Sequence, residues 1–201
     1  MEIVLFDIDR KMVECWRNDF ANMDNVHIEN MEFSKLLDSR IYNIDMVVAA
    51  ANSFGIMDGA LDRAYRDYFG IQLQEEVQKK IYEEYLGEQP IGSALVVDIP
   101  NFQGMKFCHT PTMRIPQPVD PRIVYTAMRS SLVAAHKQNA EVVLMPAFAH
   151  LTGRVDAKIV SELMLRAYND FFHSLAAKDE INWDMIFQYK NIDEVLMHLY
   201  V

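Results

Sequence analysis

Two carboxylates in one short stretch, Asp58 and Asp62, are the side chains whose spacing first suggests chemistry. They lie four residues apart where the pattern turns helical, so they would face the same way and could share a proton, which raises one pKa. A carboxylate near a developing oxocarbenium-like centre can act as a general base or stabilise charge. The alternative is that Asp58 caps the helix and Asp62 is a solvated helix charge. We adopt the solvated charge for Asp62, and for Asp58 both interpretations stay open.

The stretch Asp45–Tyr65 has to position these carboxylates. Its first part, MVVAAA, is a run of six apolar residues, which is typical of a strand buried on both faces. Asn52 and Ser53 end the run, and the glycines that follow allow a tight reversal before the helix. A buried strand that opens through a polar turn into a helix N-terminus is where α/β proteins place anionic ligands. The stretch therefore predicts a binding site.

A second strand–loop–helix corner is predicted near the end of the chain. Glu141–Phe148 indicates a buried strand, and a long helix is expected to begin at Asp156. In the loop between them, His150 either donates a hydrogen bond or a proton beside phosphates, or bonds a backbone carbonyl in a tight loop. We favour the second interpretation. Arg114, in a proline-rich segment, either touches a phosphate or pairs with a surface carboxylate, and here we favour the ion pair.

The remaining pattern predicts an α/β fold. A strand over Glu2–Asp9, a helical period behind it and a strand over Asn25–Met31 form the strand–helix–strand start of such proteins. Gln72–Tyr85 has the apolar stripe of a surface helix, ended by Gly87. We also expect a hairpin of Ser93–Ile99 with the strand that begins KFCH, and a helix that starts at Asp120 and Pro121.

Composition sets limits on function. The 201 residues suffice for one domain, and an apolar content of 51% supports a packed core. A net charge of −10 argues against general nucleic-acid binding, but backbone amides can still hold a small nucleotide. The two cysteines and six histidines show no metal spacing, and no motif of a kinase, dehydrogenase, zinc peptidase or α/β-hydrolase occurs. With no signal peptide or membrane span in the pattern, we expect a cytoplasmic protein without a metal or cofactor.

The sequence VVAAANSFGIMDGALDRAYRDYFG resembles the signature of the macro domain family, the ADP-ribose-binding module. More specifically it is similar to a bacterial and phage-type branch with a short ANSFG-x-MDG turn. Three later segments agree in order, and the resemblance runs from about Val26 to Phe172: PIGSA at 90–94, TPTMRIP at 110–116 and VLMP at 143–146. It implies a three-layer α/β/α fold with a central mixed, mostly parallel sheet. Residues 1–178 would form the domain, and residues 179–201 a C-terminal extension that packs on it or makes a dimer contact.

The resemblance also implies a function: binding of ADP-ribose or a related nucleotide, with hydrolysis of an ADP-ribosyl linkage left open. Asn52 would orient the ribose and Asp58 would activate water or the substrate, as the two catalytic residues. Asp62 stands where many hydrolytic relatives carry a histidine. Asn30 stands where an aspartate reads the adenine amino group, and its alternative role is a helix cap for Met31–Leu37. The implied ligand-binding residues are Asn30, Ala51, Asn52, Ser53, Phe54, Gly55, Gly59, Thr110, Pro111, Thr112, Ala147, Phe148, Ala149, His150, Leu151, Thr152 and Gly153.

The second loop departs from the family pattern. Relatives carry glycine near Ala147, Ala149 and Leu151, whereas here only Gly153 remains. Because leucine or histidine at positive φ is strained, the loop either takes another path or its diphosphate site is remodelled. Two alternatives follow: a non-catalytic reader or sponge of another nucleotide, or a scaffold with a degenerate pocket that acts through protein partners. A reader should keep binding when Asp58 becomes alanine, and a scaffold should bind no nucleotide.

Overall fold

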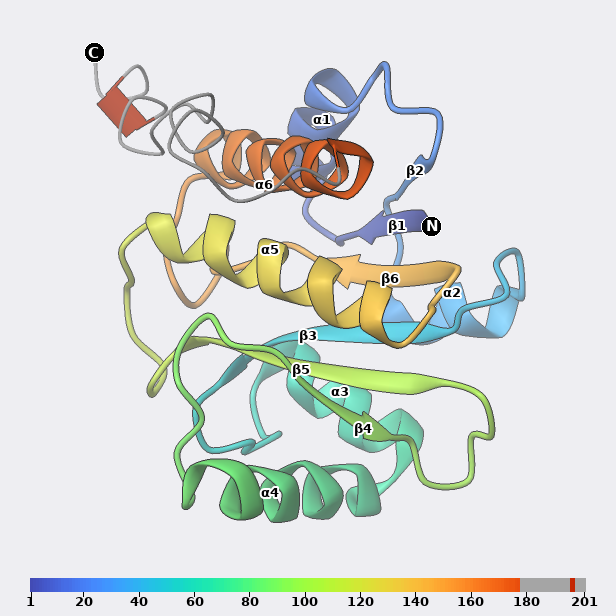
Figure 1. Cartoon of the computed structure of the whole chain (residues 1–201), viewed down its shortest axis with the longest axis vertical. Coiled ribbons are helices and arrows are strands. Elements are labelled where there is room, and N and C mark those ends of the chain that lie inside the picture. Colours follow the sequence, from blue (N-terminus) through green and yellow to red (C-terminus); the bar gives the residue numbers. More distant parts are fainter. Residues whose placement is uncertain (178–195, 198–201) are drawn as a thin grey trace.

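The computed structural model describes residues 1–177 and 196–197 and contains a six-stranded sheet (Figure 1). The strands are β1 (Glu2–Phe6), β2 (Val26–Glu29), β3 (Met46–Asn52), β4 (Leu95–Asp98), β5 (Lys106–Met113) and β6 (Val142–Pro146). Their order across the sheet is β2-β1-β6-β3-β5-β4. Only β4 runs antiparallel to its neighbour, β5, so the sheet is mixed and mostly parallel, and the expected hairpin is confirmed.

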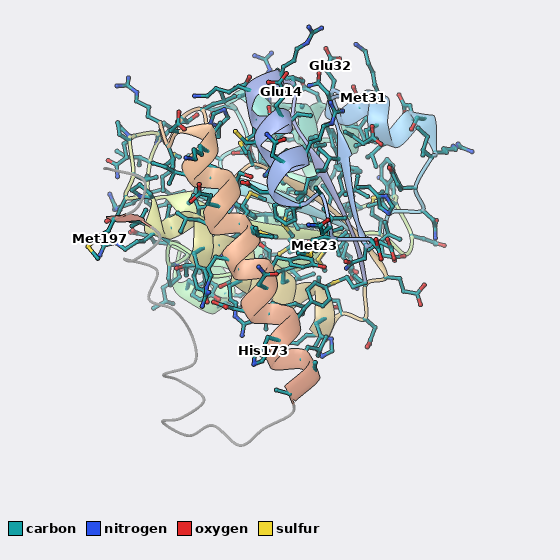
Figure 2. All side chains as sticks on the ribbon, turned by 90° about the horizontal axis from the view of Figure 1, so that it is seen from above. Glu14, Met23, Met31, Glu32, His173 and Met197 are labelled. Atoms are coloured by element: carbon teal, nitrogen blue, oxygen red, sulfur yellow. The ribbon has the colours of Figure 1, made fainter. Side chains whose placement is uncertain are left out.

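Helices cover both faces of this sheet, as the three-layer prediction requires. They are α1 (Arg10–Asp19), α2 (Phe33–Ser39), α3 (Ala60–Phe69), α4 (Ile71–Tyr85), α5 (Arg122–Lys137) and α6 (Ala157–Ala177). One apolar cluster joins α1, α5 and α6 to the sheet, and the other joins α2, α3 and α4 to the opposite face. Accordingly, α5 lies in front of the strands in Figure 1 and α3 behind them. In the view from above, α6 runs across the face of the sheet that it covers with α1 and α5, and His173 lies near its end (Figure 2).

The apolar run of β3 is explained by its place between these two layers. Val48 packs in the cluster of α1, α5 and α6, whereas Val47 and Ala49 pack in the other cluster. Since side chains alternate between the faces of a strand, a strand covered on both faces needs apolar residues at every position. All three side chains are completely buried. Asn52 is the last residue of this strand and therefore lies at the C-terminal edge of the sheet, where the polar turn begins.

A register shift between β3 and β5 opens the sheet at that edge. Ala51 pairs with Pro111 and Asn52 pairs with Met113, so Thr112 is an extra residue on β5. Such bulges bend a strand and often occur next to active sites, because they redirect a side chain. The backbone N–H of Ser53 then donates a hydrogen bond to the carbonyl oxygen of Met113, with 3.1 Å between nitrogen and oxygen. The chain leaves the sheet here and turns toward α3.

Several local predictions are confirmed. The surface helix α4 buries Leu73, Val77 and Ile81. Its C-cap, Leu86, is left-handed, and Gly87 comes next, with a φ of 101°. The helix expected after Asp120 and Pro121 is α5, which begins at Arg122. The free cysteines are far apart, Cys108 buried and Cys15 partly so. No helix in the described ranges is long and apolar enough to cross a membrane.

Three capping predictions are wrong. The N-cap of α5 is Pro121, not Asp120, although the backbone N–H of Arg122 does donate to the carboxylate of Asp120 at 2.9 Å. The N-cap of α3 is Gly59, not Asp58, because the chain is still extended at Gly59, and no side chain caps the helix. The N-cap of α2 is Glu32, and the amide of Asn30 instead donates to the carbonyl oxygen of Asp7 at 2.9 Å. The predicted C-terminal extension, residues 179–201, lies almost entirely outside the described residues.

Candidate functional site

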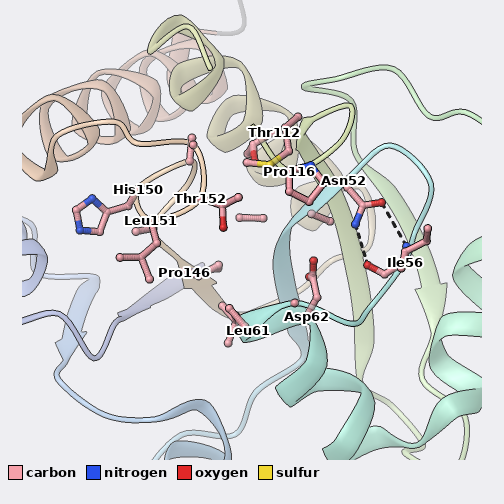
Figure 3. A pocket seen from close by; sticks show the side chains of 18 of the residues that line it. Asn52, Ile56, Leu61, Asp62, Thr112, Pro116, Pro146, His150, Leu151 and Thr152 are labelled. Carbon is pink, nitrogen blue, oxygen red and sulfur yellow. Dashed lines mark hydrogen bonds between the residues drawn. The ribbon is translucent and has the colours of Figure 1, made fainter. Parts of the chain in front are cut away.

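A cavity of about 230 Å³ lies at the C-terminal edge of the sheet, where β3, β5 and β6 end. In parallel α/β sheets this edge is the usual place for ligands. The first turn of α3 and the loop after β6 form its two sides (Figure 3). The lining residues are Asp7, Ala50, Ala51, Asn52, Ile56, Asp58, Gly59, Ala60, Leu61, Asp62, Thr112, Met113, Pro116, Pro146, Ala147, Ala149, His150, Leu151, Thr152 and Gly153.

The cavity brings together most, but not all, of the residues predicted from the sequence. Both predicted catalytic residues, Asn52 and Asp58, line it, as do Ala51, Gly59, Thr112 and residues 147 and 149–153. The other predicted ligand-binding residues do not line it: Asn30, Ser53, Phe54, Gly55, Thr110, Pro111 and Phe148. Thr110 and Phe148 point into the core instead, where the Thr110 hydroxyl lies 2.9 Å from that of Ser131.

Asn52 organises the loop that follows β3. Its Oδ1 accepts hydrogen bonds from the backbone N–H groups of Phe54 at 3.1 Å and Ile56 at 3.3 Å. Its Nδ2 donates to the carbonyl oxygen of Ile56 at 2.8 Å, as the dashed lines in Figure 3 show. Asparagine suits this position because its side chain replaces backbone partners within a turn. The amide of Asn52 therefore fixes the loop that forms this wall of the cavity and leads to Asp58.

Asp62 is the site residue that the sequence interpretation placed wrongly. Its side chain lines the cavity and points into it in Figure 3, so it is not a solvated helix charge. Burial, together with the smaller effect of the nearby charge of Asp58, raises the pKa of this carboxyl from 3.8 to about 7. The signal was present in the sequence, since the spacing from Asp58 predicted a raised pKa for one member of the pair. Burial, the larger cause, depends on the tertiary fold.

A second carboxylate that the sequence did not single out is Asp7, directly after β1. Burial raises its pKa, opposed by the backbone N–H of Asp9, which donates to the Asp7 carboxylate at 2.8 Å. Asp58 and Asp62 are the other acids on the wall. Among the described residues that line the cavity there is no lysine or arginine.

His150 is anchored away from the centre of the cavity. Its Nδ1 lies 3.0 Å from the carbonyl oxygen of Val155, which can only accept, so Nδ1 carries the hydrogen. Its Nε2 lies 2.8 Å from the carboxylate of Asp9, and this contact lowers the pKa of Asp9. The favoured interpretation, a histidine bound to a backbone carbonyl, is confirmed, and the ion pair with Asp9 is an addition. Figure 3 shows the ring directed away from Asp62.

The glycine-poor loop avoids the strain that its composition suggested. Positive φ falls on Ala149, at 58°, and on Arg154, at 57°, and not on His150 or Leu151. Gly153 remains necessary for another reason: a Cβ there would lie 2.5 Å from the carbonyl oxygen of Ala149. The loop therefore follows its own path, closed by a bond of 3.2 Å from the N–H of Val155 to the same carbonyl oxygen.

Arg114 takes no part in the cavity. Its guanidinium makes two hydrogen bonds to Glu88, at 2.6 and 3.1 Å, and lies 5.2 Å from the ring centre of Phe54. The predicted surface ion pair is confirmed. Within residues 1–177 and 196–197 there is also no group of three side chains that could hold a metal ion.

The macro domain profile matches residues 48–164, which is more than half of the sequence. The chain therefore belongs to the macro domain family, and the predicted three-layer fold is confirmed. The matched range contains both corners of the cavity. A comparison with curated proteins gives no match.

Three solved structures illustrate the similarity of fold. The macrodomain of Mycobacterium tuberculosis DarG is 18% identical with a TM-score of 0.56, over 64% of this chain and 84% of that one. An Oceanobacillus iheyensis macrodomain with MES bound is 14% identical with a TM-score of 0.58, over 78% and 87% of the two chains. A Trypanosoma brucei macrodomain in complex with ADP-ribose is 18% identical with a TM-score of 0.56, over 65% and 53%.

Proposed function

We propose that this cavity binds ADP-ribose or a related ADP-ribose-type nucleotide. The observation that carries the proposal is the first turn of α3, which lines the cavity and has no side-chain cap. The first N–H groups of a helix have no partner within it, so an uncapped N-terminus favours an anionic group such as a diphosphate. Membership of the macro domain family supports this ligand class, as does the ADP-ribose in the T. brucei structure.

The walls of the cavity suit the rest of such a ligand. Leu61, Pro116, Pro146 and Leu151 give it apolar surface, which a base or the carbon face of a ribose can cover. Because no lysine or arginine of the described residues lines it, the diphosphate would depend on backbone N–H groups for its positive partners.

Gly59 offers a test that leaves the fold intact. A Cβ at this position meets no atom within 4 Å, and the backbone is extended with φ of −104°, so other residues fit without strain. We expect calorimetric titration with ADP-ribose to show saturable binding to the natural protein and to Gly59→Ala. In Gly59→Trp the indole would fill the cavity, and affinity should fall roughly tenfold or more, a cost of about 1.4 kcal/mol. Circular dichroism of both variants checks their folding.

Two results would contradict the proposal. Absence of saturation at millimolar ADP-ribose at any pH would favour the scaffold alternative, and equal affinity of Gly59→Trp and the natural protein would place the ligand elsewhere. Saturable binding of another nucleotide in place of ADP-ribose would favour the reader or sponge of a different ligand.

Hydrolysis of an ADP-ribosyl linkage is a second candidate function. It is favoured by two carboxylates at the cavity, Asp62 in α3 and Asp58 just before it. In this reaction water attacks the anomeric carbon, the bond to the leaving group breaks, and Asp58 accepts the proton of the water. Asn52 would act through the loop that it holds. Incubation with an ADP-ribosylated protein should release ADP-ribose, and Asp58→Ala should abolish release while binding persists. A reader would release none, with binding unchanged by the substitution.

A further inference from the structure

Asp62 is the third residue of α3, and its side chain has unused hydrogen-bonding capacity. Within the described part of the chain its carboxyl group has neither a hydrogen bond nor an ion pair. An acidic side chain three residues after the N-cap often bonds back to the N-cap N–H, but Asp62 makes no such bond to Gly59. Its carboxyl group points into the cavity (Figure 3).

The elements around Asp62 bring acidic side chains near it, whereas the basic side chains on these elements bind other partners. Asp58 approaches from the preceding turn and Asp7 from the end of β1, and both line the same cavity. Across the cavity, His150 of the loop after β6 is held by Asp9 and by a backbone carbonyl.

Within α3 itself the neighbouring groups are also engaged. The hydroxyl of Tyr65 donates to the carbonyl oxygen of Val48 at 3.0 Å, and burial raises the pKa of this tyrosine, helped by the charge of Asp62. Arg63 and Arg66 both pair with Asp67, at 3.6 and 3.5 Å.

A second polar group without a partner belongs to a residue of the cavity wall. Thr112, the extra residue of the β5 bulge, is only 1% exposed, and its hydroxyl is buried with no hydrogen-bond partner in the described structure. A buried hydroxyl without a partner costs roughly 1–3 kcal/mol, so such groups usually have a function. Thr112 lines the cavity from the sheet side, and Asp62 from the helix side.

An anion at the start of α3 would lie beside Asp62. Two negative charges repel each other more strongly in a cavity than in bulk water, because the local dielectric constant is lower. If the carboxyl group is neutral, the repulsion disappears and its O–H can donate to a ligand oxygen. Burial and Asp58 already raise the pKa of Asp62 to about 7, so neutralising it at ordinary pH costs little free energy.

We propose that Asp62 contacts the anionic part of the ligand as a neutral carboxylic acid, and that ligand binding is therefore coupled to the uptake of one proton. This inference rests on the proposed function and names the residue that recognises the anionic part of the ligand. Asp62 donates its O–H to a phosphate-type oxygen. The proton comes from the solvent and is returned when the ligand leaves. Anionic ligands should thus bind more tightly as the pH falls toward neutrality.

The test is calorimetric titration with ADP-ribose between about pH 6 and about pH 8, in two buffers of different ionisation enthalpy. For the natural protein we expect affinity to fall by up to about tenfold per unit above pH 7, with proton uptake that approaches one per ligand. Asp62→Asn keeps a neutral donor, so its affinity should change little with pH. Asp24→Asn replaces an exposed acid that does not line the cavity, so it should behave like the natural protein and serves as the control.

The possible outcomes separate the two proposals. If the natural protein binds with affinity that is constant or rises with pH, or if Asp62→Asn keeps the full pH dependence, the role of Asp62 is wrong and the proposed function stands. Retained dependence would assign the proton to a group other than Asp62. If neither protein binds ADP-ribose at about pH 6, the proposed function is wrong and this inference with it. The buffer measurement needs no variant, so absence of proton uptake would overturn the role of Asp62 even if Asp62→Asn does not fold.

Discussion

The two strand–helix corners that form the cavity use their polar groups in opposite ways. In the corner between β6 and α6, His150 bonds Asp9 and Val155, and Asp156 bonds Lys11 and the N–H of Lys158. In the corner between β3 and α3, Asn52 secures the loop, but Asp62 and the first turn of the helix are left without side-chain partners in the described structure.

This difference assigns a role to each corner. A closed network of satisfied groups rigidifies a loop, whereas unsatisfied groups at a cavity are available to a ligand. Under the proposed function, the corner between β6 and α6 is therefore the fixed wall, and the corner between β3 and α3 is the recognition corner, the side that would contact the ligand. Substitutions in the first should change stability, and substitutions in the second should change binding and pH dependence.

The largest expected effect is Gly153→Ala, in the fixed wall. The added Cβ would lie 2.5 Å from the carbonyl oxygen and 2.9 Å from the Cα of Ala149, and backbone atoms cannot rotate away as a side chain can. Because Ala149 already has a left-handed backbone, we expect a loss of about 2–4 kcal/mol in the free energy of unfolding. Urea denaturation measures it. Gly59→Ala in the other corner is the matched control, since its Cβ meets nothing within 4 Å, and it should cost below about 1 kcal/mol. Equal losses would contradict the contrast between the corners.

A smaller effect of opposite sign is expected for Asp62→Asn. The native state keeps the Asp62 proton up to about pH 7, whereas the unfolded chain loses it near 3.8. Ionisation of Asp62 therefore destabilises the native state, and this loss grows from about pH 4 to about pH 7 and is constant above. Asparagine avoids it. A pKa shift of this size corresponds to roughly 4 kcal/mol. Because Asp62 is only partly removed from solvent, we expect about half of this, so the variant should be more stable than the natural protein by about 2 kcal/mol at pH 8, and by less near pH 4. Thermal unfolding at both pH values measures the difference, and a gain that is independent of pH would contradict a buried, raised-pKa carboxyl.

Much of this architecture could be predicted from local pattern. The apolar run of β3, the stripe of α4 and the hairpin of β4 and β5 follow from residue periodicity, which reports burial directly. The cavity itself was also predictable, because a buried strand followed by a polar turn and a helix determines where the chain leaves the sheet.

The errors concern side chains whose environment is set by distant segments. Asp62 becomes buried only when the loop after β6 is packed opposite α3, and Asp7 enters the cavity only because β1 lies next to β6. Asn30 does not cap α2, as one of its two predicted roles required, because the end of β2 directs its amide to the backbone of Asp7. Periodicity along the chain contains no information on such contacts between segments.

The smallest of these effects on stability is expected for substitution of Asn52. This residue belongs to the recognition corner between β3 and α3, but its hydrogen bonds stay within its own loop. Asn52→Ala removes three hydrogen bonds to residues 54 and 56, and because the loop is partly exposed, water can replace some of them. We expect a loss of about 1–1.5 kcal/mol in the free energy of unfolding, measured by urea denaturation. Asn52→Asp keeps the acceptor for both N–H groups and loses only the donor to Ile56, so it should lose less. If alanine and aspartate cost the same, the Nδ2 bond alone holds the loop. If neither costs anything while ADP-ribose binding is lost, Asn52 serves the ligand directly, and the recognition corner would then include the strand end as well as the helix.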